Sequence, residues 1–401
     1  MTTTGTITTF YVDSTGVDLG KQFVEEDYLI SVYPNLIPNF KSAGLFSCGE
    51  NTYGQLGNSS TSITNSLGET TAKGTNWKNV SAGRSFALGI KTDGTLWTWG
   101  RNQFGQLGNT STIDRSSPIQ VTGTTWMKSA AGETHSAAVK TDGTLWTWGY
   151  NTTGQLGDET TTHRSSPVQT KAAGTNWLDV ACGLYHVVAI KTDGTLWGWG
   201  RNLNGELGDD TRTNKSSPVQ TKALGTNWKQ VSCGSDHTMA IKYDGTLWGW
   251  GSNTNGRLGD NTTTSKSSPV QVVGSSTNWK QVSCGQTHTA AVKTDGTLWC
   301  WGDNNVGQLG DNSTTHRSSP VQTVTSGTNW NSVSGGYRMT SAIKTDGTLW
   351  VWGVGANGSL GTNDFTHRSS PLQTASYGNT WRGLMKGPTT RSNYAIRDFE
   401  F

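Results

Sequence analysis

Hydrophobic and polar residues alternate on both sides of an Asp-Gly pair that recurs along this chain. In one copy, residues 191–200, the residues that lead up to Asp193-Gly194 read as a strand with apolar side chains at alternate positions, and Leu-Trp-Gly-Trp follows the pair after one threonine. An Asp-Gly pair between two such runs is a strong hairpin signal, because both central residues of a type I′ turn need a positive φ. The pattern therefore predicts two antiparallel strands joined by a two-residue type I′ turn.

The hairpin is one part of a long internal repeat. The lysine that opens it recurs six times, in steps of 51 residues with one step of 49, at Lys91, Lys140, Lys191, Lys242, Lys293 and Lys344. A second marker, a tryptophan followed by a further predicted strand, recurs seven times, at Trp77, Trp126, Trp177, Trp228, Trp279, Trp330 and Trp381. Units of about 50 residues with four strands each are typical of propeller blades. We therefore predict an all-β fold, a seven-bladed β-propeller of four-stranded antiparallel blades.

The two ends of the repeat are complementary. Residues 45–57 copy the second hairpin strand and its loop without the strand before them, and residues 395–401 match that missing strand and then stop. Pairing of these N- and C-terminal strands would close the ring and remove an exposed sheet edge. We predict closure by this pairing.

Each hairpin copy carries two tryptophans at positions i and i+2, which point to the same face of a strand. We expect these pairs to pack between neighbouring blades, where one buried indole removes about 150–250 Å² from water. The structural set is Trp97, Trp99, Trp146, Trp148, Trp197, Trp199, Trp248, Trp250, Trp299, Trp301, Trp350 and Trp352.

Residues 1–43 lie outside the repeat, which occupies residues 44–401. A strand is possible at 6–12, and residues 24–33 place apolar side chains at helical spacing before Pro34 ends any helix. We expect an N-terminal arm that either caps the propeller or attaches it to a larger assembly.

Composition narrows the class of protein. Charged residues make up 15% of the chain and the net charge is +3, which gives no overall basic character for nucleic acid. No run of 18 apolar residues predicts membrane insertion, and the N-terminus lacks the pattern of a secretory signal, so a cytoplasmic or virion location is expected. Cys182, Cys233 and Cys284 share a repeat position with alanine and glycine elsewhere, as expected of small buried residues. We predict no cofactor and no metal.

The motif Trp-Gly-x-Asn-x-x-Gly-Gln-Leu-Gly, after a Gly-x-x-His-x-x-Ala-Ile/Val segment, resembles the regulator of chromosome condensation repeat. The resemblance covers about residues 44–401 and implies seven four-stranded blades whose closure is shared by the two termini. Functions in that family include nucleotide exchange on a small GTPase, light sensing, scaffolding, and structural roles in bacteria and phages. The fold therefore does not choose the function.

Six basic residues share one loop position before Ser-Ser-Pro, and symmetry places them at one radius. Such a ring would suit phosphate, sulfate or carboxylate groups of a partner. The alternative is that each cation pairs with a nearby carboxylate, such as Asp158 or Asp209. The six are Arg115, Arg164, Lys215, Lys266, Arg317 and Arg368.

Four histidines share one position in consecutive blades, but Phe86 and Met339 replace them elsewhere, which favours packing over metal binding. The repeat is irregular at residues 63–68, 336–339 and 383–391, beside the closure. Tyr337, Arg338 and Arg391 in these segments are candidate partner-binding residues, and adaptation to closure is the alternative.

An active site needs different side chains on different loops, and the loops of this repeat are nearly identical. We therefore predict a binding protein rather than an enzyme. The leading hypothesis is a structural or attachment component of a virion, such as a phage tail, with a protein partner held through residues 1–43. Two alternatives remain open. One is an exchange factor for a small GTPase, although units of 49 or 51 residues leave no room for the extra wedge that the family resemblance associates with exchange. The other is a glycan- or peptide-binding module that uses the basic ring.

Overall fold

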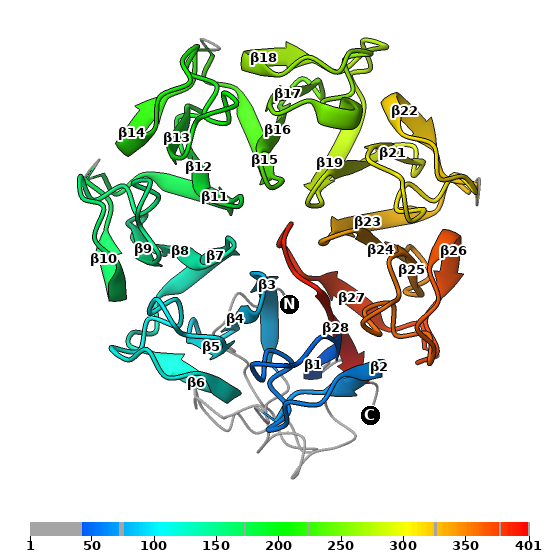
Figure 1. Ribbon diagram of the computed structural model, residues 1–401, viewed down its shortest axis with the longest axis horizontal. Coiled ribbons are helices and arrows are strands. Elements are labelled where there is room, and N and C mark those ends of the chain that lie inside the picture. The colour runs from blue at the N-terminus through cyan, green and yellow to red at the C-terminus, as the bar shows by residue number, and fades with distance from the viewer. Residues whose placement is uncertain are drawn as a thin grey trace, which may run out of the picture.

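The chain forms a ring of seven four-stranded antiparallel sheets around a central channel (Figure 1). The computed structural model describes residues 42–71, 76–171, 174–222, 225–324, 327–376 and 378–399. The predicted seven-bladed propeller is confirmed. The strand and helix predicted within residues 1–41 lie outside the described residues.

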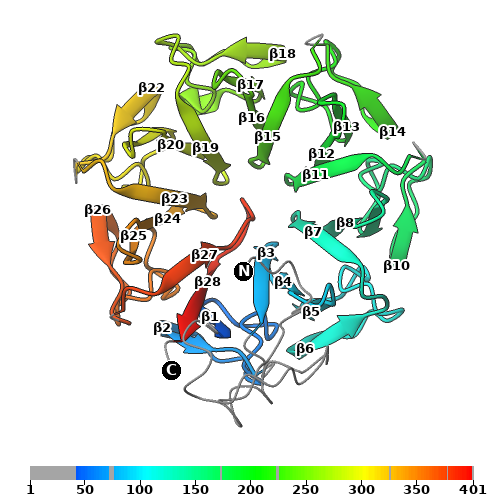
Figure 2. The same cartoon turned by 180° about the vertical axis from the view of Figure 1, so that it is seen from behind.

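Blades 1 to 6 each consist of four consecutive strands, numbered from the channel outward (Figures 1 and 2). Blade 1 contains β3 (Trp77–Ala82), β4 (Phe86–Lys91), β5 (Leu96–Gly100) and β6 (Arg115–Val121). Blade 2 contains β7 (Trp126–Ala131), β8 (His135–Lys140), β9 (Leu145–Gly149) and β10 (Arg164–Gln169). Blade 3 contains β11 (Trp177–Cys182), β12 (His186–Lys191), β13 (Leu196–Gly200) and β14 (Lys215–Gln220).

The next three blades repeat this order. Blade 4 contains β15 (Trp228–Cys233), β16 (His237–Lys242), β17 (Leu247–Gly251) and β18 (Lys266–Gln271), with the short 3-10 helix η1 (Thr254–Gly256) in its loop. Blade 5 contains β19 (Trp279–Cys284), β20 (His288–Lys293), β21 (Leu298–Gly302) and β22 (Arg317–Gln322). Blade 6 contains β23 (Trp330–Gly335), β24 (Met339–Lys344), β25 (Leu349–Gly353) and β26 (Arg368–Gln373). In the described part of the chain, no helix has the length and apolar character needed to cross a bilayer.

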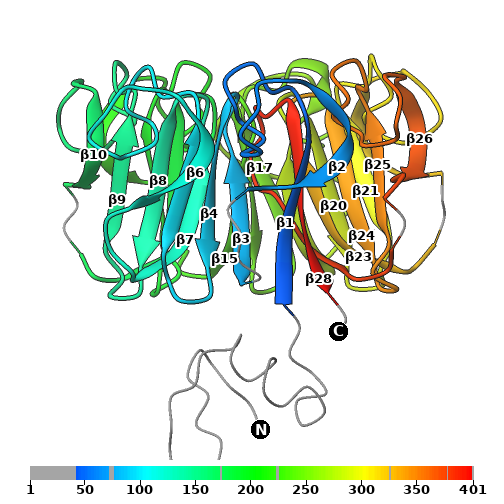
Figure 3. The ribbon, with the colours of Figure 1, turned by 90° about the horizontal axis from the view of Figure 1, so that it is seen from below.

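Blade 7 joins the two ends of the chain. From the channel outward it contains β27 (Trp381–Leu384), β28 (Ser392–Phe399), β1 (Ser42–Gly49) and β2 (Thr64–Glu69). β1 and β28 pair along their whole length, from Ser42 opposite Phe399 to Gly49 opposite Ser392. The predicted closure is confirmed, and the first strand begins two residues before the expected boundary at 44. We call the face where β1 begins and β28 ends the lower face, and the opposite one the upper face (Figure 3).

The Asp-Gly hairpins differ from the predicted type I′ turn. Gly194 has a φ of 76°, but Asp193 is not among the residues with positive φ. Gly194 N–H donates to Lys191 O, so the turn spans three residues, with glycine in the left-handed position that follows a type I turn. Asp193 Oδ1 instead accepts the N–H and the hydroxyl of Thr195 at 2.9 and 2.7 Å. The aspartate therefore stabilises the turn through its side-chain hydrogen bonds and not by adopting a positive φ.

The two tryptophans of each hairpin copy differ in burial. Trp199 is completely buried between blades 2 and 3, where its Nε1 donates to Gln155 O of the preceding blade at 3.0 Å. Trp197 is only partly buried, and its Nε1 donates to Thr195 Oγ1 at 2.9 Å. Lys191 Nζ lies over Trp197 and over Trp177, 4.5 and 4.9 Å from the ring centroids. The second tryptophan therefore fills the seam, and the first shields the lower end of the blade.

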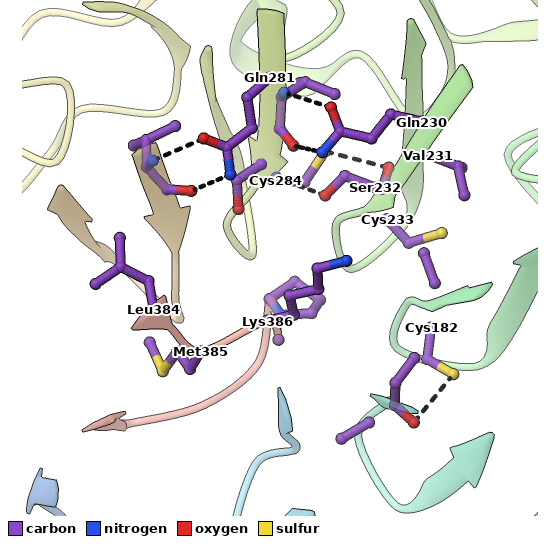
Figure 4. Close-up of a pocket in the computed structure, with 18 of the residues that line it drawn as sticks. Cys182, Gln230, Val231, Ser232, Cys233, Gln281, Cys284, Leu384, Met385 and Lys386 are labelled. Carbon is purple, nitrogen blue, oxygen red and sulfur yellow. Dashed lines mark hydrogen bonds between the residues drawn. The ribbon is translucent and has the colours of Figure 1, made fainter. Parts of the chain in front are cut away.

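Side chains from neighbouring blades close the free edges of the inner strands (Figure 4). Gln230 Nε2 donates to Val282 O at 3.4 Å, and Val282 N–H donates to Gln230 Oε1 at 3.1 Å. Cys284 N–H donates to Ser232 Oγ at 2.9 Å. All five cysteines are free and buried, and for Cys182, Cys233 and Cys284 this agrees with the prediction from their shared repeat position. These contacts satisfy backbone groups that an inner edge strand would otherwise leave unpaired.

Three of the four aligned histidines also connect neighbouring blades. His186 Nε2 lies 3.1 Å from Thr238 Oγ1 of the next blade, and His288 Nε2 lies 2.9 Å from Thr340 Oγ1. Burial lowers the pKa of His186 to about 3, so the imidazole is neutral at pH 7. Within the described ranges, no group of three or more His, Cys, Asp or Glu side chains is placed to hold a metal ion.

Replacing Trp199 by alanine should lower the free energy of unfolding by about 3–5 kcal/mol, because it leaves a cavity in a sealed seam. The matched control is Trp197→Ala, which removes a partly exposed indole from the same strand and should cost clearly less. Chemical denaturation of both variants measures the difference. Equal midpoints for Trp199→Ala and the wild type would contradict burial of this side chain in the seam.

The buried histidines should make the propeller acid-sensitive. Their pKa is lowered in the folded state, so the unfolded chain binds more protons below about pH 6.5, and stability falls as the pH drops from there toward 4. For His186 the loss at pH 5 is on the order of 1–2 kcal/mol. His186→Met copies the residue of blade 6 and should flatten the dependence of the unfolding midpoint on pH between 7 and 5. An unchanged slope would show that His186 is protonated when folded.

Candidate partner-binding site at the upper mouth of the channel

Short loops between the first two strands of each blade surround the channel on the upper face. They are joined from blade to blade by backbone hydrogen bonds. Leu184 N–H donates to Ser235 O at 3.0 Å, Ser235 N–H to Gln286 O at 3.1 Å, and Tyr337 N–H to Thr390 O at 2.9 Å. This ring fixes the backbone, so side chains on these loops are presented from a rigid rim.

A cavity of about 260 Å³ lies inside this rim. Its walls come from blades 1, 2, 3, 5, 6 and 7, so loops distant in sequence contribute to one site. We call the following five residues the upper-mouth site: Arg84, Glu133, Tyr185, Tyr337 and Arg391.

Tyr337 is the centre of a cation–aromatic cluster on one side of the cavity. The guanidinium carbon of Arg391 lies 4.6 Å from the Tyr337 ring centroid, and that of Arg338 lies 5.4 Å from it. Arg391 also lies 3.7 Å from a carboxylate oxygen of Glu50. Guanidinium groups over an aromatic face are held in place while their N–H groups still point outward.

An ion pair forms the opposite side. Arg84 Nη1 donates to Glu133 Oε1 at 2.7 Å, and this hydrogen bond raises the pKa of Arg84. Burial raises the pKa of Tyr185, and the charge of Glu133 raises it further, so the phenol keeps its proton. The site therefore offers cations, hydroxyl donors and aromatic faces in a fixed arrangement. This set is suited to recognition of polar and aromatic groups.

The structure brings together three residues that the sequence singled out. Tyr337, Arg338 and Arg391 lie beside one another at the upper mouth, although they come from two irregular segments of different blades. Their role in binding stays a prediction.

The predicted basic ring lies elsewhere, at the start of the outer strands, and most of its charges are balanced locally. Arg164 Nε lies 3.1 Å from Asp158 Oδ2, and Arg317 Nη2 lies 3.0 Å from Asp311 Oδ2. The other pairs are Lys215 with Asp209 and Lys266 with Asp260, both at 3.7 Å, and Arg368 with Asp364 at 2.5 Å.

Arg115 differs from the other members of the ring. Asn109 stands where blades 2 to 5 place an aspartate, and Arg115 forms no ion pair with any residue that the structure describes. The five balanced members are therefore weak candidates for binding an anion, since a partner would have to displace an internal carboxylate.

Arg84, Glu133 and Tyr185 were missed by the sequence analysis. They occupy the two positions between glycine and histidine of Gly-x-x-His, where the repeats do not agree: one blade has Arg84-Ser85, the next Glu133-Thr134. Variation at these two loop positions of an otherwise uniform repeat is the signal that could have found them.

Comparisons with known proteins agree with this architecture. Residues 44–386 match the RCC1-like domain. The ultraviolet-B receptor UVR8 of Arabidopsis thaliana is 32% identical over 302 residues, which cover 73% of this chain and 69% of the receptor. The probable E3 ubiquitin-protein ligase HERC4 of Homo sapiens is 34% identical over 201 residues, 49% of this chain but only 19% of that protein.

A solved structure, that of Prp20p from Saccharomyces cerevisiae, has a TM-score of 0.76 and covers 90% of this chain and 92% of its own. Its sequence identity of 18% makes this a likeness of fold. The match to the domain begins in β1, reaches every blade and ends between β27 and β28. This chain therefore belongs to the RCC1-like domain family of seven-bladed β-propellers.

Proposed function

We propose that this protein is a non-catalytic binding propeller that holds a protein partner at the upper-mouth site. The observation that carries the proposal is the clustering of Tyr337 with Arg391 and Arg338 at the edge of a cavity of about 260 Å³. Tyrosine and arginine are enriched among the residues that dominate protein–protein binding energy, particularly where they line a rigid concave surface.

Two further features support a protein as the partner. The rim is fixed by hydrogen bonds between successive loops, so little conformational entropy is lost on binding. Prp20p, whose fold is similar, is described by its binding to Gsp1p and histones. Protein binding on a propeller of this shape therefore has a precedent, although the identity of the partner does not transfer at 18% identity.

The finer proposal is that the protein is a structural or attachment component of a larger assembly, such as a virion. β1 begins at Ser42 on the lower face, opposite the upper-mouth site. Residues 1–41 precede this point, so an attachment through them and a partner at the upper mouth would lie on opposite faces. Most cations of the outer wall are already paired with internal carboxylates, and this favours a structural role for that wall over the binding of a charged ligand.

The double variant Tyr337→Ala/Arg391→Ala should lose its protein partner, whereas Arg317→Ala on the outer wall should keep it. Loss of two central residues of an interface weakens binding by at least about tenfold, and loss of an exposed ion pair by less than about threefold. The partner is identified by affinity purification from the native source, and its affinity is then measured with purified proteins. Equal affinities of both variants would contradict the proposal.

The assembly is tested separately with the full chain and a form that lacks residues 1–41. Co-sedimentation with native particles should be seen for the full chain and lost without the arm. If neither form associates with any particle, the virion proposal is wrong.

Faster nucleotide release from a small GTPase in the presence of the wild-type protein would replace the proposal with an exchange function.

A further inference from the structure

The inner strands carry an excess of positive charge. The seven inner strands, together with Lys386 two residues after β27, contain six cations and one carboxylate, Asp179, in a chain whose formal net charge is only +3. The rest of the protein is therefore slightly negative. The six cations are Lys78, Lys128, Lys229, Lys280, Arg382 and Lys386.

A bulge at the start of each inner strand directs these side chains along the channel wall. The strand register shifts after the tryptophan, for example between Trp279 and Gln281. As a result two consecutive side chains reach toward the same neighbouring blade: Lys280 Nζ donates to Asn331 O at 3.2 Å, and Gln281 Nε2 donates to Val333 O at 3.3 Å. The cations that follow the tryptophans are thus arranged around the lower mouth of the channel.

A cavity of about 230 Å³ lies inside the channel, between the middle and the upper ends of the inner strands. Of the six cations, Arg382 and Lys386 contribute to its wall. Figure 4 shows the Lys386 side chain projecting into the open space between the inner strands. Most of the remaining lining side chains are small or polar, such as Ala130, Cys182 and Ser332. The space is therefore wide enough for a compact ion and has one sign of charge.

Internal carboxylates do not balance these cations. Arg382 pairs with Asp398 at 2.6 Å, but none of the five lysines has a carboxylate oxygen within 4.0 Å in the described ranges. On the outer wall of the same protein, by contrast, Lys215 and Lys266 each have an aspartate. Lysines on the outer wall are thus paired with carboxylates, whereas the lysines along the channel are not.

The lysines also affect one another. Burial lowers the pKa of Lys128, Asp179 raises it, and the charges of Lys386 and Lys78 lower it. Like charges held together at a partly desolvated position are repulsive, and an anion between them removes this repulsion.

We propose that the channel, from the cations at its lower mouth to the cavity that Lys386 lines, is a binding site for a compact oligophosphate. Lysine ammonium groups are point charges with freely rotating donors, so several of them around an axis can contact a phosphate chain from all sides. An extended peptide fits less well, because the strand edges that it would pair with are occupied by Gln230, Gln281 and Ser232. This site lies below the upper-mouth site and is independent of the function proposed there.

The test is isothermal titration of the full chain with sodium tripolyphosphate at fixed ionic strength. The wild type should show saturable binding that an equal concentration of sulfate does not abolish. Lys128→Gln/Lys386→Gln should weaken binding at least about tenfold, because it removes two converging charges. The matched control, Lys171→Gln/Lys222→Gln, removes the same charge from exposed ion pairs on the surface and should change affinity less than about twofold.

Lys386→Arg keeps the charge and should retain most of the affinity. If the double variant does not fold, as judged by its thermal melting curve, Lys78→Gln/Lys229→Gln at the exposed rim takes its place with the same expected loss. Absence of saturable binding to the wild type would overturn the proposal. Equal weakening by the channel and surface variants would also overturn it, because affinity would then follow total charge alone.

Discussion

The propeller depends on one contact that recurs at the seams between its blades. An indole is buried against the preceding blade and donates its N–H to a loop carbonyl there, as Trp199 does to Gln155 and Trp148 to Gln106. Gly157 is part of the same contact, because its φ is 64° and a Cβ would lie 2.9 Å from Trp199 Nε1. In six of the seven Gly-x-Leu-Gly motifs the final glycine lies in this way against the tryptophan of the next blade, and at the closure Gly361 lies against Cys48 instead. Nearly the same contact therefore recurs from seam to seam around the ring.

The second constraint is that every blade has an inner edge. Seven inner strands face one channel, and their backbone groups cannot all be left to water. The sequence satisfies them with short polar side chains, such as Gln281 and Ser283, that reach the next blade. Because these side chains occupy the backbone groups, the inner strands offer few free edges with which another strand could pair. The distinctive property of the channel is therefore the charge of the side chains beside the tryptophans. The charged side chains that face the channel are thus not the residues that hold the blades together.

Much of the fold could be predicted from the sequence, because a period of about 50 residues and two tryptophan markers report directly on repeated contacts. The closure followed from a strand in surplus at one end and one missing at the other. The turn type was wrong, because Asp193 serves as a hydrogen-bond acceptor and only Gly194 adopts a positive φ. Tyr337 and Arg391 were noticed because they break the pattern. The direction of Lys128 and Lys280 was not predictable, since a bulge overrides the alternation that sequence reasoning assumes for a strand.

The pairing of β1 with β28 has a consequence for how this architecture can change. Ser42 and Phe399 lie opposite each other, so the two ends of the described ring are neighbours in space. A permuted chain, in which these two ends are linked and new ends are placed at another lower-face hairpin, would form the same contacts between blades with the blades in a different order along the sequence. Circular permutation would move the blade that is shared by the two ends from one position in the ring to another without altering the channel. Which blade is shared is therefore set by the order of the strands along the chain, and not by the symmetry that the tryptophans impose.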